Sequence, residues 1–236
     1  MKKLIAMAYL AISIMANAED KIATIDRYNE EHNPYNGNFL EVKVKSVSLK
    51  KLSIPDYSEI GEIKYEIPPL YAIELVDNTY LIKEGRKRST QVLDSAIDLM
   101  MKYSVRFSHL NILNSKMKMI SKDQKHIFVQ DYFYKNVLCE NYYTYSDDKL
   151  ESVEVWDVGA SSPSVVSTYS MIKHNNKYYI KSIASTNYKN PNTMLFEIEY
   201  YIYKNYLLPT KVKTRTEGNG TCFLFEYILD STITTQ

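Results

Sequence analysis

The side chains best suited to acid–base, nucleophilic or metal chemistry are scattered along this chain. Four histidines are present, and none has a second ligand at metal-binding spacing: His32, His109, His126 and His174. Two cysteines cannot supply the usual zinc pairs, and the serines between positions 161 and 164 stand in a loop-like stretch without a nucleophile elbow. The sequence therefore predicts no enzyme active site, no metal and no cofactor.

The charged clusters also lack a catalytic arrangement. Asp147 and Asp148 sit in a turn, and Glu197 and Glu199 alternate on the polar side of a strand, which is typical of solvated carboxylates. The basic run 86–88 could grip an anionic head group, but three charges in a loop are more typical of an exposed surface. With a formal net charge of +1, the chain as a whole shows no signature of nucleic-acid or anionic-membrane binding.

The first 18 residues have the layout of a signal peptide. Lys2 and Lys3 precede an apolar run, and Ala16-Asn17-Ala18 forms a small-x-small cleavage site. The run is shorter than the roughly 20 apolar residues that span a bilayer, and no cysteine stands at the cleavage site to carry a lipid. We predict a soluble exported protein, periplasmic or secreted, that is not a lipoprotein and starts at Glu19. Intact mass tests this prediction, and a species that keeps residues 1–18 would contradict it.

Cys139 and Cys222 leave two alternatives open. Export would allow them to form a disulfide, which would close a long loop and stabilise the fold by roughly 4 kcal/mol in the chain-entropy model. Alternatively, they are separate buried thiols that act as small apolar side chains.

Apolar periodicity predicts the elements that surround these residues. Ile22, Ile25 and Tyr28 recur at helical spacing and indicate a short N-terminal helix that ends before Asn33-Pro34. A second, central helix is predicted over 89–101, with a single apolar stripe. Strands at 40–49, with a bulge near Lys45-Ser46, and at 61–67, 71–75 and 80–82 lie between the two helices.

From position 107 onward the pattern is strand after strand. Turns are predicted at 121–123, 135–136, 146–148, 175–176, 204–205 and 217–220. In the final meander one strand is expected to bury Phe196, Ile198, Tyr200 and Ile202. Residues 19–236 are thus predicted to form one antiparallel domain, mainly β with packed helices.

Two stretches carry a resemblance to a known family. The first runs from Gly61 through Pro68-Pro69 to Leu75 and on to the turn at Gly85-Arg86. The second is the strand, turn and strand 198–212, with Leu208-Pro209 at its centre. Together with the order of elements, they resemble the periplasmic lipoprotein-carrier and outer-membrane lipoprotein-sorting (LolA-like) superfamily. The first stretch has Ala72 where that family often has arginine, so no functional residue is transferred.

The resemblance implies an incomplete antiparallel barrel, a half-barrel covered by the N-terminal and central helices. The space between helices and sheet would hold acyl chains. The side chains expected to line that groove are Ile63, Tyr65, Ile73, Leu93, Ile97, Phe196 and Ile198.

Two functions from different classes follow. The first is an exported carrier or sensor that binds lipid or lipoprotein acyl chains in an apolar groove, at roughly 0.8 kcal/mol for each buried CH₂. The alternative is a secreted or surface-associated protein–protein interaction module without a small-molecule ligand. That alternative is favoured by the 22 tyrosines, because tyrosine is enriched at interfaces. An exported hydrolase is disfavoured, because no nucleophile has an obvious base.

Overall fold

A computed structural model describes most of the chain outside its first residues and its centre. The described ranges are 20–35, 38–54, 56, 58–66, 72–76, 79–83, 113–114, 116–122, 124–134 and 137–235. The predicted signal segment 1–18 and the predicted central helix 89–101 lie outside these ranges, so both stay predictions.

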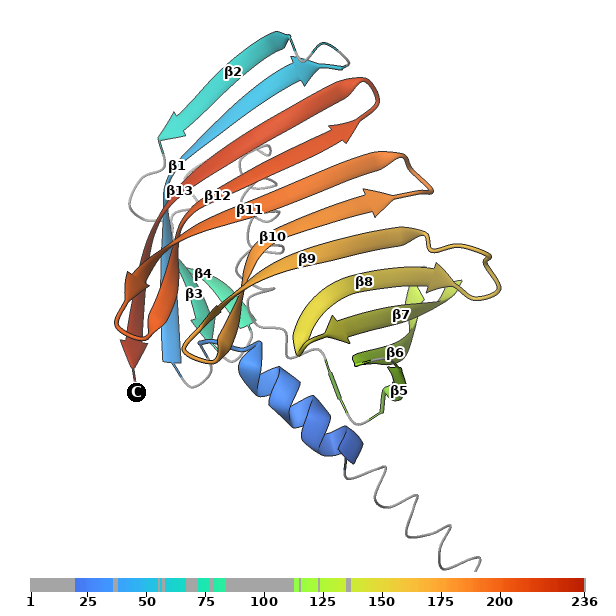
Figure 1. Cartoon of the computed structure of the whole chain (residues 1–236). Helices are drawn as coiled ribbons and strands as arrows, with labels where there is room; N and C mark the ends of the chain where they lie inside the picture. The colour runs from blue at the N-terminus through green and yellow to red at the C-terminus, as the bar shows by residue number, and fades with distance from the viewer. Residues whose placement is uncertain are drawn as a thin grey trace, which may run out of the picture.

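The described residues form one helix, residues 20–31, and thirteen strands (Figure 1). The first five strands are β1 Asn38–Ser53, β2 Glu59–Glu66, β3 Ala72–Val76, β4 Thr79–Lys83 and β5 Lys118–Lys122. The next four are β6 Lys125–Tyr134, β7 Val137–Ser146, β8 Lys149–Asp157 and β9 Val165–His174. The last four are β10 Lys177–Asn187, β11 Asn192–Tyr203, β12 Tyr206–Gly218 and β13 Thr221–Thr235.

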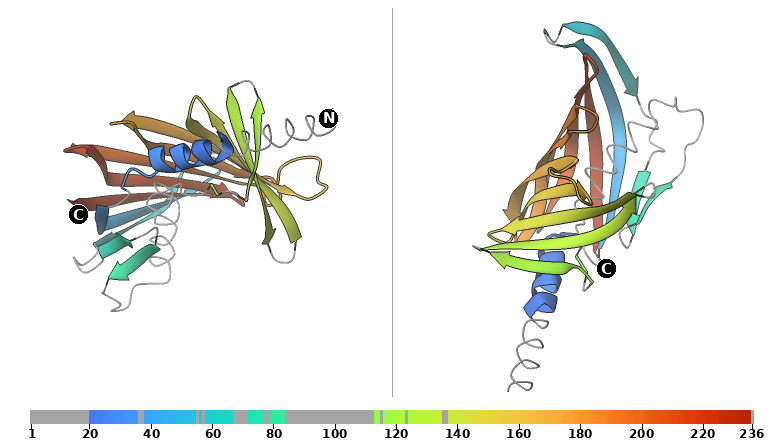
Figure 2. Two further views of the ribbon diagram at one scale, coloured as in Figure 1. Left: turned by 90° about the horizontal axis from the view of Figure 1, so that it is seen from below. Right: turned by 90° about the vertical axis from the view of Figure 1, so that its right-hand side faces the viewer.

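All thirteen strands belong to one antiparallel sheet. Its order is β4-β3-β1-β13-β12-β11-β10-β9-β8-β7-β6-β5, with β2 paired to β1. Figure 2 shows the sheet as a single curved layer whose two ends do not meet. The prediction of a half-barrel covered by two helices is therefore wrong: the described chain is an open sheet with one short helix. Closure depends on whether distant strands pair, and local alternation carries no information about that.

Tight turns explain why β5 to β13 follow one another as a meander. Three of the connections have both central residues in the left-handed region: Asp147-Asp148, Asn175-Asn176 and Asn219-Gly220. Type I′ turns require this conformation, and Asn, Asp and Gly adopt it readily. These hairpins and the bulge near Lys45-Ser46 are confirmed, since the register of β1 shifts between Val44 and Ser46.

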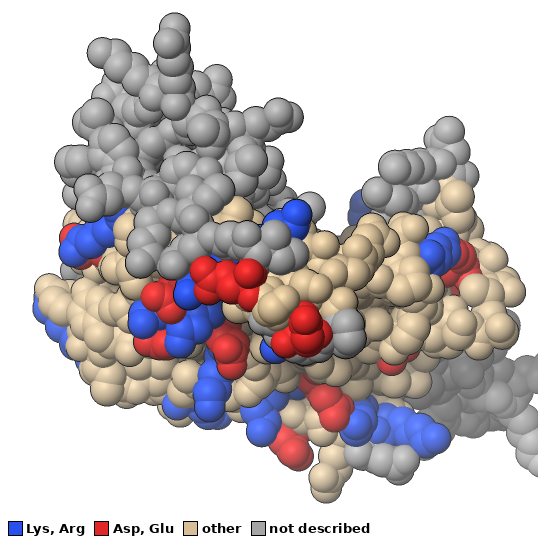
Figure 3. Space-filling model, turned by 90° about the horizontal axis from the view of Figure 1, so that it is seen from above, with Lys and Arg blue, Asp and Glu red and all other residues tan. Residues whose placement is uncertain are grey.

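The two faces of the sheet differ in chemistry, because side chains alternate along each strand. On the apolar face, Val47, Tyr227, Val212 and Ile198 are neighbours in register across β1, β13, β12 and β11, and each is buried. The polar face carries the residues between them, including Glu197, Lys213 and Glu226. Figure 3 shows basic and acidic side chains interspersed rather than gathered by sign.

The predicted N-terminal helix is confirmed, and it packs on the apolar face of β6–β9. Ile25 and Tyr28 enter a buried cluster with Phe128, Tyr145 and Leu150. The ring of Tyr28 stacks on that of Tyr145, with centroids 4.4 Å apart and planes 7° apart. Among the described residues, no helix is long and apolar enough to cross a membrane.

Candidate functional site: the rim of the apolar face

One row of the apolar face stays partly open to solvent. Six half-buried side chains, one from each strand between β13 and β8, are neighbours in register: Phe223, Thr216, Met194, Ser185, Ser167 and Val153. We call these residues the rim row. At about 4.8 Å between strands, the row extends for roughly 24 Å.

The next row toward the helix end is closed. It contains Thr214, Phe196 and Ile183, whose side chains are no more than 2% exposed, and Phe225, which is half-buried. The rim row is thus a partly exposed strip of three apolar and three hydroxyl side chains at the edge of a packed core. Such a strip can take an extended apolar ligand without disturbing the core.

Hydroxyl groups are interspersed among the apolar side chains of the rim row. Ser167 Oγ donates to Ser185 Oγ at 3.0 Å. Thr216 Oγ1 is buried and has no hydrogen-bond partner among the described residues. A buried hydroxyl without a partner is unfavourable.

A hollow of about 500 Å³ lies at the β13 end of the row. It is lined by Thr216, Glu217, Gly218 and Phe223 together with the turn residues 190–192 and 219. Its lining combines one aromatic ring and the Glu217 side chain with polar turn groups, a composition that suits the polar end of an amphiphile better than an alkyl chain.

The structure places the residues predicted to line one groove in different parts of the sheet. Phe196 and Ile198 lie in the closed core, 0% and 5% exposed. In the backbone register Ile63 pairs with Leu49, and Tyr65 pairs with Val47.

Ile73, which is on β3, pairs with Val42 in the other half of β1. Leu93 and Ile97 lie outside the described residues. Sequence reasoning missed the rim row because serine and threonine on a strand interrupt the apolar alternation on which it relied.

His32, which follows the helix directly, fastens the helix to the sheet. Its Nδ1 lies 2.9 Å from the carbonyl oxygen of Tyr28, and Leu150 N donates to its Nε2 at 3.3 Å. Since a carbonyl oxygen only accepts, Nδ1 must carry the proton and Nε2 must be bare. The ring also stacks on Tyr178, with centroids 4.8 Å apart.

This environment favours the neutral imidazole. Burial is the largest cause, and it lowers the pKa of His32 from 6.5 to about 4. The hydrogen bond to the Tyr28 carbonyl and the charge of Asp148 oppose the shift, whereas Lys173 adds to it. No sequence signal separated this histidine from the other three, because its burial depends on strands more than 110 positions away.

The cysteines are both free and buried, as in the second of the two alternatives. Cys139 is on β7 and Cys222 on β13, six strands apart in the sheet order, or roughly 29 Å along the sheet. A disulfide needs Cα atoms within about 7 Å, so these two cysteines cannot pair in this fold. Within the described ranges, no three His, Cys, Asp or Glu side chains lie close enough together to hold a metal ion.

The opposite face has a hollow of its own. About 500 Å³ of space lies over Leu195 and Leu224, with Lys213, Arg215 and Glu226 among its charged walls. Glu199 bonds Lys213 at 2.9 Å and lies 3.8 Å from Lys211 on the same face. Salt bridges this exposed add little stability, and walls of mixed sign do not select a charged ligand.

Comparison with known proteins yields one structural likeness. No protein-family model matches the chain, and no curated protein matches it in sequence. Among solved structures, a LolA superfamily protein from Nitrosomonas europaea aligns with 91% of this chain and 92% of its own, at 10% identity and a TM-score of 0.32.

Proposed function

We propose that this chain is an exported, non-catalytic protein that binds lipid or lipoprotein acyl chains along the rim row, in a carrier or sensor role. The observation that supports the proposal is the row itself, a half-exposed strip of Phe223, Met194 and Val153 with hydroxyls between them. An acyl chain spans about 15 Å, half of a 30 Å hydrocarbon core, and the row is roughly 24 Å long. One chain therefore fits along it.

The chemistry of the row suits an amphiphile. Apolar contact provides the affinity, since each methylene removed from water contributes about 0.8 kcal/mol. Thr216 lines the hollow between the turns, where the polar end of the ligand would lie. An open row also permits release, because no described element has to move before the ligand leaves.

A fluorescent fatty-acyl probe tests the proposal. We expect saturable binding with a Kd in the micromolar range, equivalent to about −8 kcal/mol. Met194→Glu should weaken this binding at least tenfold, because a carboxylate would lie against the acyl chain in the middle of the row. The measurement is a fluorescence titration, with the melting temperature of each variant as a check on folding.

The neighbouring residue provides a matched control. Leu195 lies on the same strand and is half-buried like Met194, but it lines the hollow on the polar face. Leu195→Glu should therefore leave probe binding unchanged. Equal loss in both variants, or no saturable binding by the wild type, would reject the rim row as an acyl site and favour the interaction module.

A further inference from the structure

The β11–β12 hairpin continues past the residues at which β10 and β13 pair with it. β10 pairs with β11 only over residues 192–197, and β13 pairs with β12 only over residues 211–218. Beyond those positions, the two strands of the hairpin continue to pair with each other as far as Tyr203 and Tyr206. Side-chain hydrogen bonds still tie this end to both neighbouring strands: Tyr200 Oη donates to the carbonyl oxygen of Ile180 on β10 at 2.7 Å, and Tyr201 Oη donates to that of Ser231 on β13 at 2.8 Å.

Large apolar side chains are exposed at this end. Ile202 is 68% exposed, Tyr201 39% and Tyr203 40%. The alternation of the strand predicts a buried Ile202, and that prediction is wrong, because Ile202 stands next to the turn, past the last residue of β11 that pairs with β10. We call residues 201–206 the hairpin tip.

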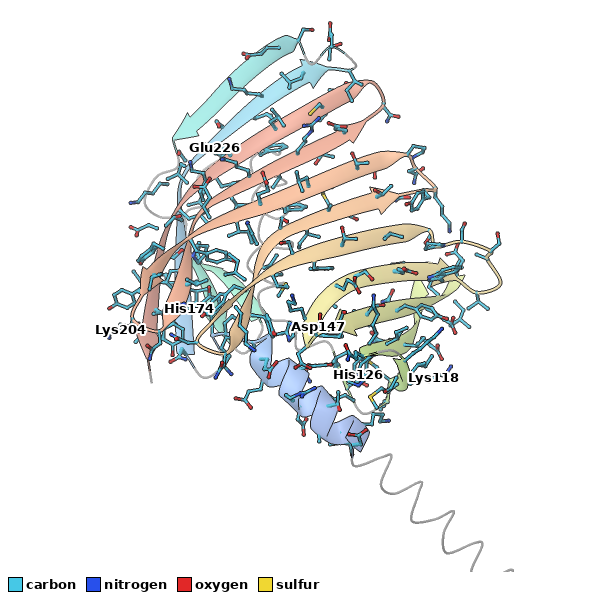
Figure 4. All side chains as sticks on the ribbon, viewed as in Figure 1. Lys118, His126, Asp147, His174, Lys204 and Glu226 are labelled. Atoms are coloured by element: carbon cyan, nitrogen blue, oxygen red, sulfur yellow. The ribbon has the colours of Figure 1, made fainter. Side chains whose placement is uncertain are left out.

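A second tip adds positive charge beside the first. Asn175 Nδ2, in the β9–β10 turn, donates to the carbonyl oxygen of Asn205 at 3.1 Å, so the two tips touch. Figure 4 shows Lys204 and His174 at this same end of the sheet. Segments 173–177 and 201–206 contain three lysines and no carboxylate.

The lysines differ in their surroundings. Lys204 Nζ lies 5.4 Å from the ring centroid of Tyr203, and Lys173 Nζ lies 4.8 Å from that of Tyr178. Lys177 pairs with Glu30 of the helix at 3.2 Å. Two of the three positive charges at the tips thus lie next to aromatic rings, and the third is paired with a carboxylate.

We propose that the paired tips contact the surface of an anionic lipid bilayer. Ile202 would enter the edge of the hydrocarbon, the tyrosines would lie at head-group level, and Lys173 and Lys204 would face lipid phosphates. Tyrosine and lysine prefer that depth, and juxtamembrane lysines contribute about 1 kcal/mol each at an anionic surface.

A lipid surface suits the tip better than a protein partner does. A stable protein interface uses about 20–30 residues on each side and needs complementary shape. A two-residue turn with three exposed apolar side chains is too small for that. A bilayer can accept a narrow hairpin turn, because lipid head groups do not require a surface of complementary shape. The inference goes beyond acyl binding and does not depend on it.

Vesicle cosedimentation tests the inference with the full chain. We expect binding to vesicles of phosphatidylcholine with about 30% phosphatidylglycerol, and much weaker binding to phosphatidylcholine alone or at high salt. Ile202→Ser should weaken binding to the anionic vesicles about tenfold, since 1.4 kcal/mol corresponds to that factor. Lys204→Glu should weaken it mainly at low salt.

The control is Val158→Ser, which removes an apolar side chain 56% exposed at the end of β8. It should bind vesicles as the wild type does. All variants carry the same residues 1–18, so any contribution from that segment is common to them. The inference is overturned if the wild type does not bind anionic vesicles, or if Ile202→Ser binds them as strongly as the wild type does.

Self-association at the tip would also overturn it. In that case the wild type would form a dimer without lipid, and Ile202→Ser would not. Acyl-probe binding by Ile202→Ser separates the two proposals: it should equal that of the wild type, because the rim row is on the opposite half of the sheet from the tip.

Discussion

Phe196→Ala is expected to lower the free energy of unfolding by about 3–5 kcal/mol, among the largest effects of any single truncation in this protein. The ring is fully buried, between Thr214 of β12 and Ile183 of β10 in register. Removing it leaves a cavity in the middle of a sheet that has little freedom to collapse around it. Urea unfolding of the two proteins measures the difference.

Glu197→Ala is the control for this change. The side chain follows Phe196 on β11 but is exposed on the polar face, so its loss should change stability by no more than about 0.5 kcal/mol. If Phe196→Ala were equally mild, the ring would lie in a loosely packed cavity, as the family resemblance implied, rather than in the core.

Acid is expected to destabilise the protein through His32. The folded pKa is about 4 and the ordinary value is 6.5, so the unfolded chain binds a proton that the folded chain excludes. The stabilising contribution is complete above pH 6.5 and is lost as the pH falls from 6.5 to 4. At 1.36 kcal/mol for each pKa unit, the loss is about 3 kcal/mol.

The structural reason is that a proton added to Nε2 of His32 would have no hydrogen-bond acceptor. Nε2 of His32 already faces the Leu150 N–H, so protonation would set two donors against each other. Unfolding curves at pH 7 and pH 4 measure the effect. A His32→Gln variant should be less stable at pH 7, but it should lose about 3 kcal/mol less on acidification than the wild type.

His174→Gln provides the comparison for that experiment. His174 is half-buried at the end of β9, and its Nε2 lies 3.2 Å from Nδ2 of the neighbouring Asn175. It should keep the acid sensitivity of the wild type. If His32→Gln kept that sensitivity as well, the buried imidazole would not be its source.

Local chemistry made the strands and turns predictable from sequence. Asn175-Asn176 favours a left-handed pair of residues, and alternation on either side of it gives β9 and β10. The helix was predictable because Ile25 and Tyr28 share one face and Pro34 follows. In each case the deciding interactions lie within a few positions of one another.

Properties set by distant strands were not predictable in this way. Whether the sheet closes depends on partners for β4 and β5, the outermost strands of its order, which no local pattern specifies. Ile202 alternates correctly but lies past the last residue of β11 that pairs with β10. No residue of the rim row gives a sequence signal by itself, because the strip forms only when six strands pair in register.

The pairing of β1 with β13 has a consequence for the order of folding. The meander from β5 to β13 is built from adjacent hairpins, which close short loops and can form early. β1 instead pairs with β13 from Asn38↔Thr235 to Ser53↔Thr221, across nearly the whole described chain. This contact must form after β13 has been synthesised, and a chain truncated before Thr221 would leave both β1 and β12 with an unpaired edge. Unpaired edges recruit other chains, so truncated products should aggregate rather than persist as shorter folded forms.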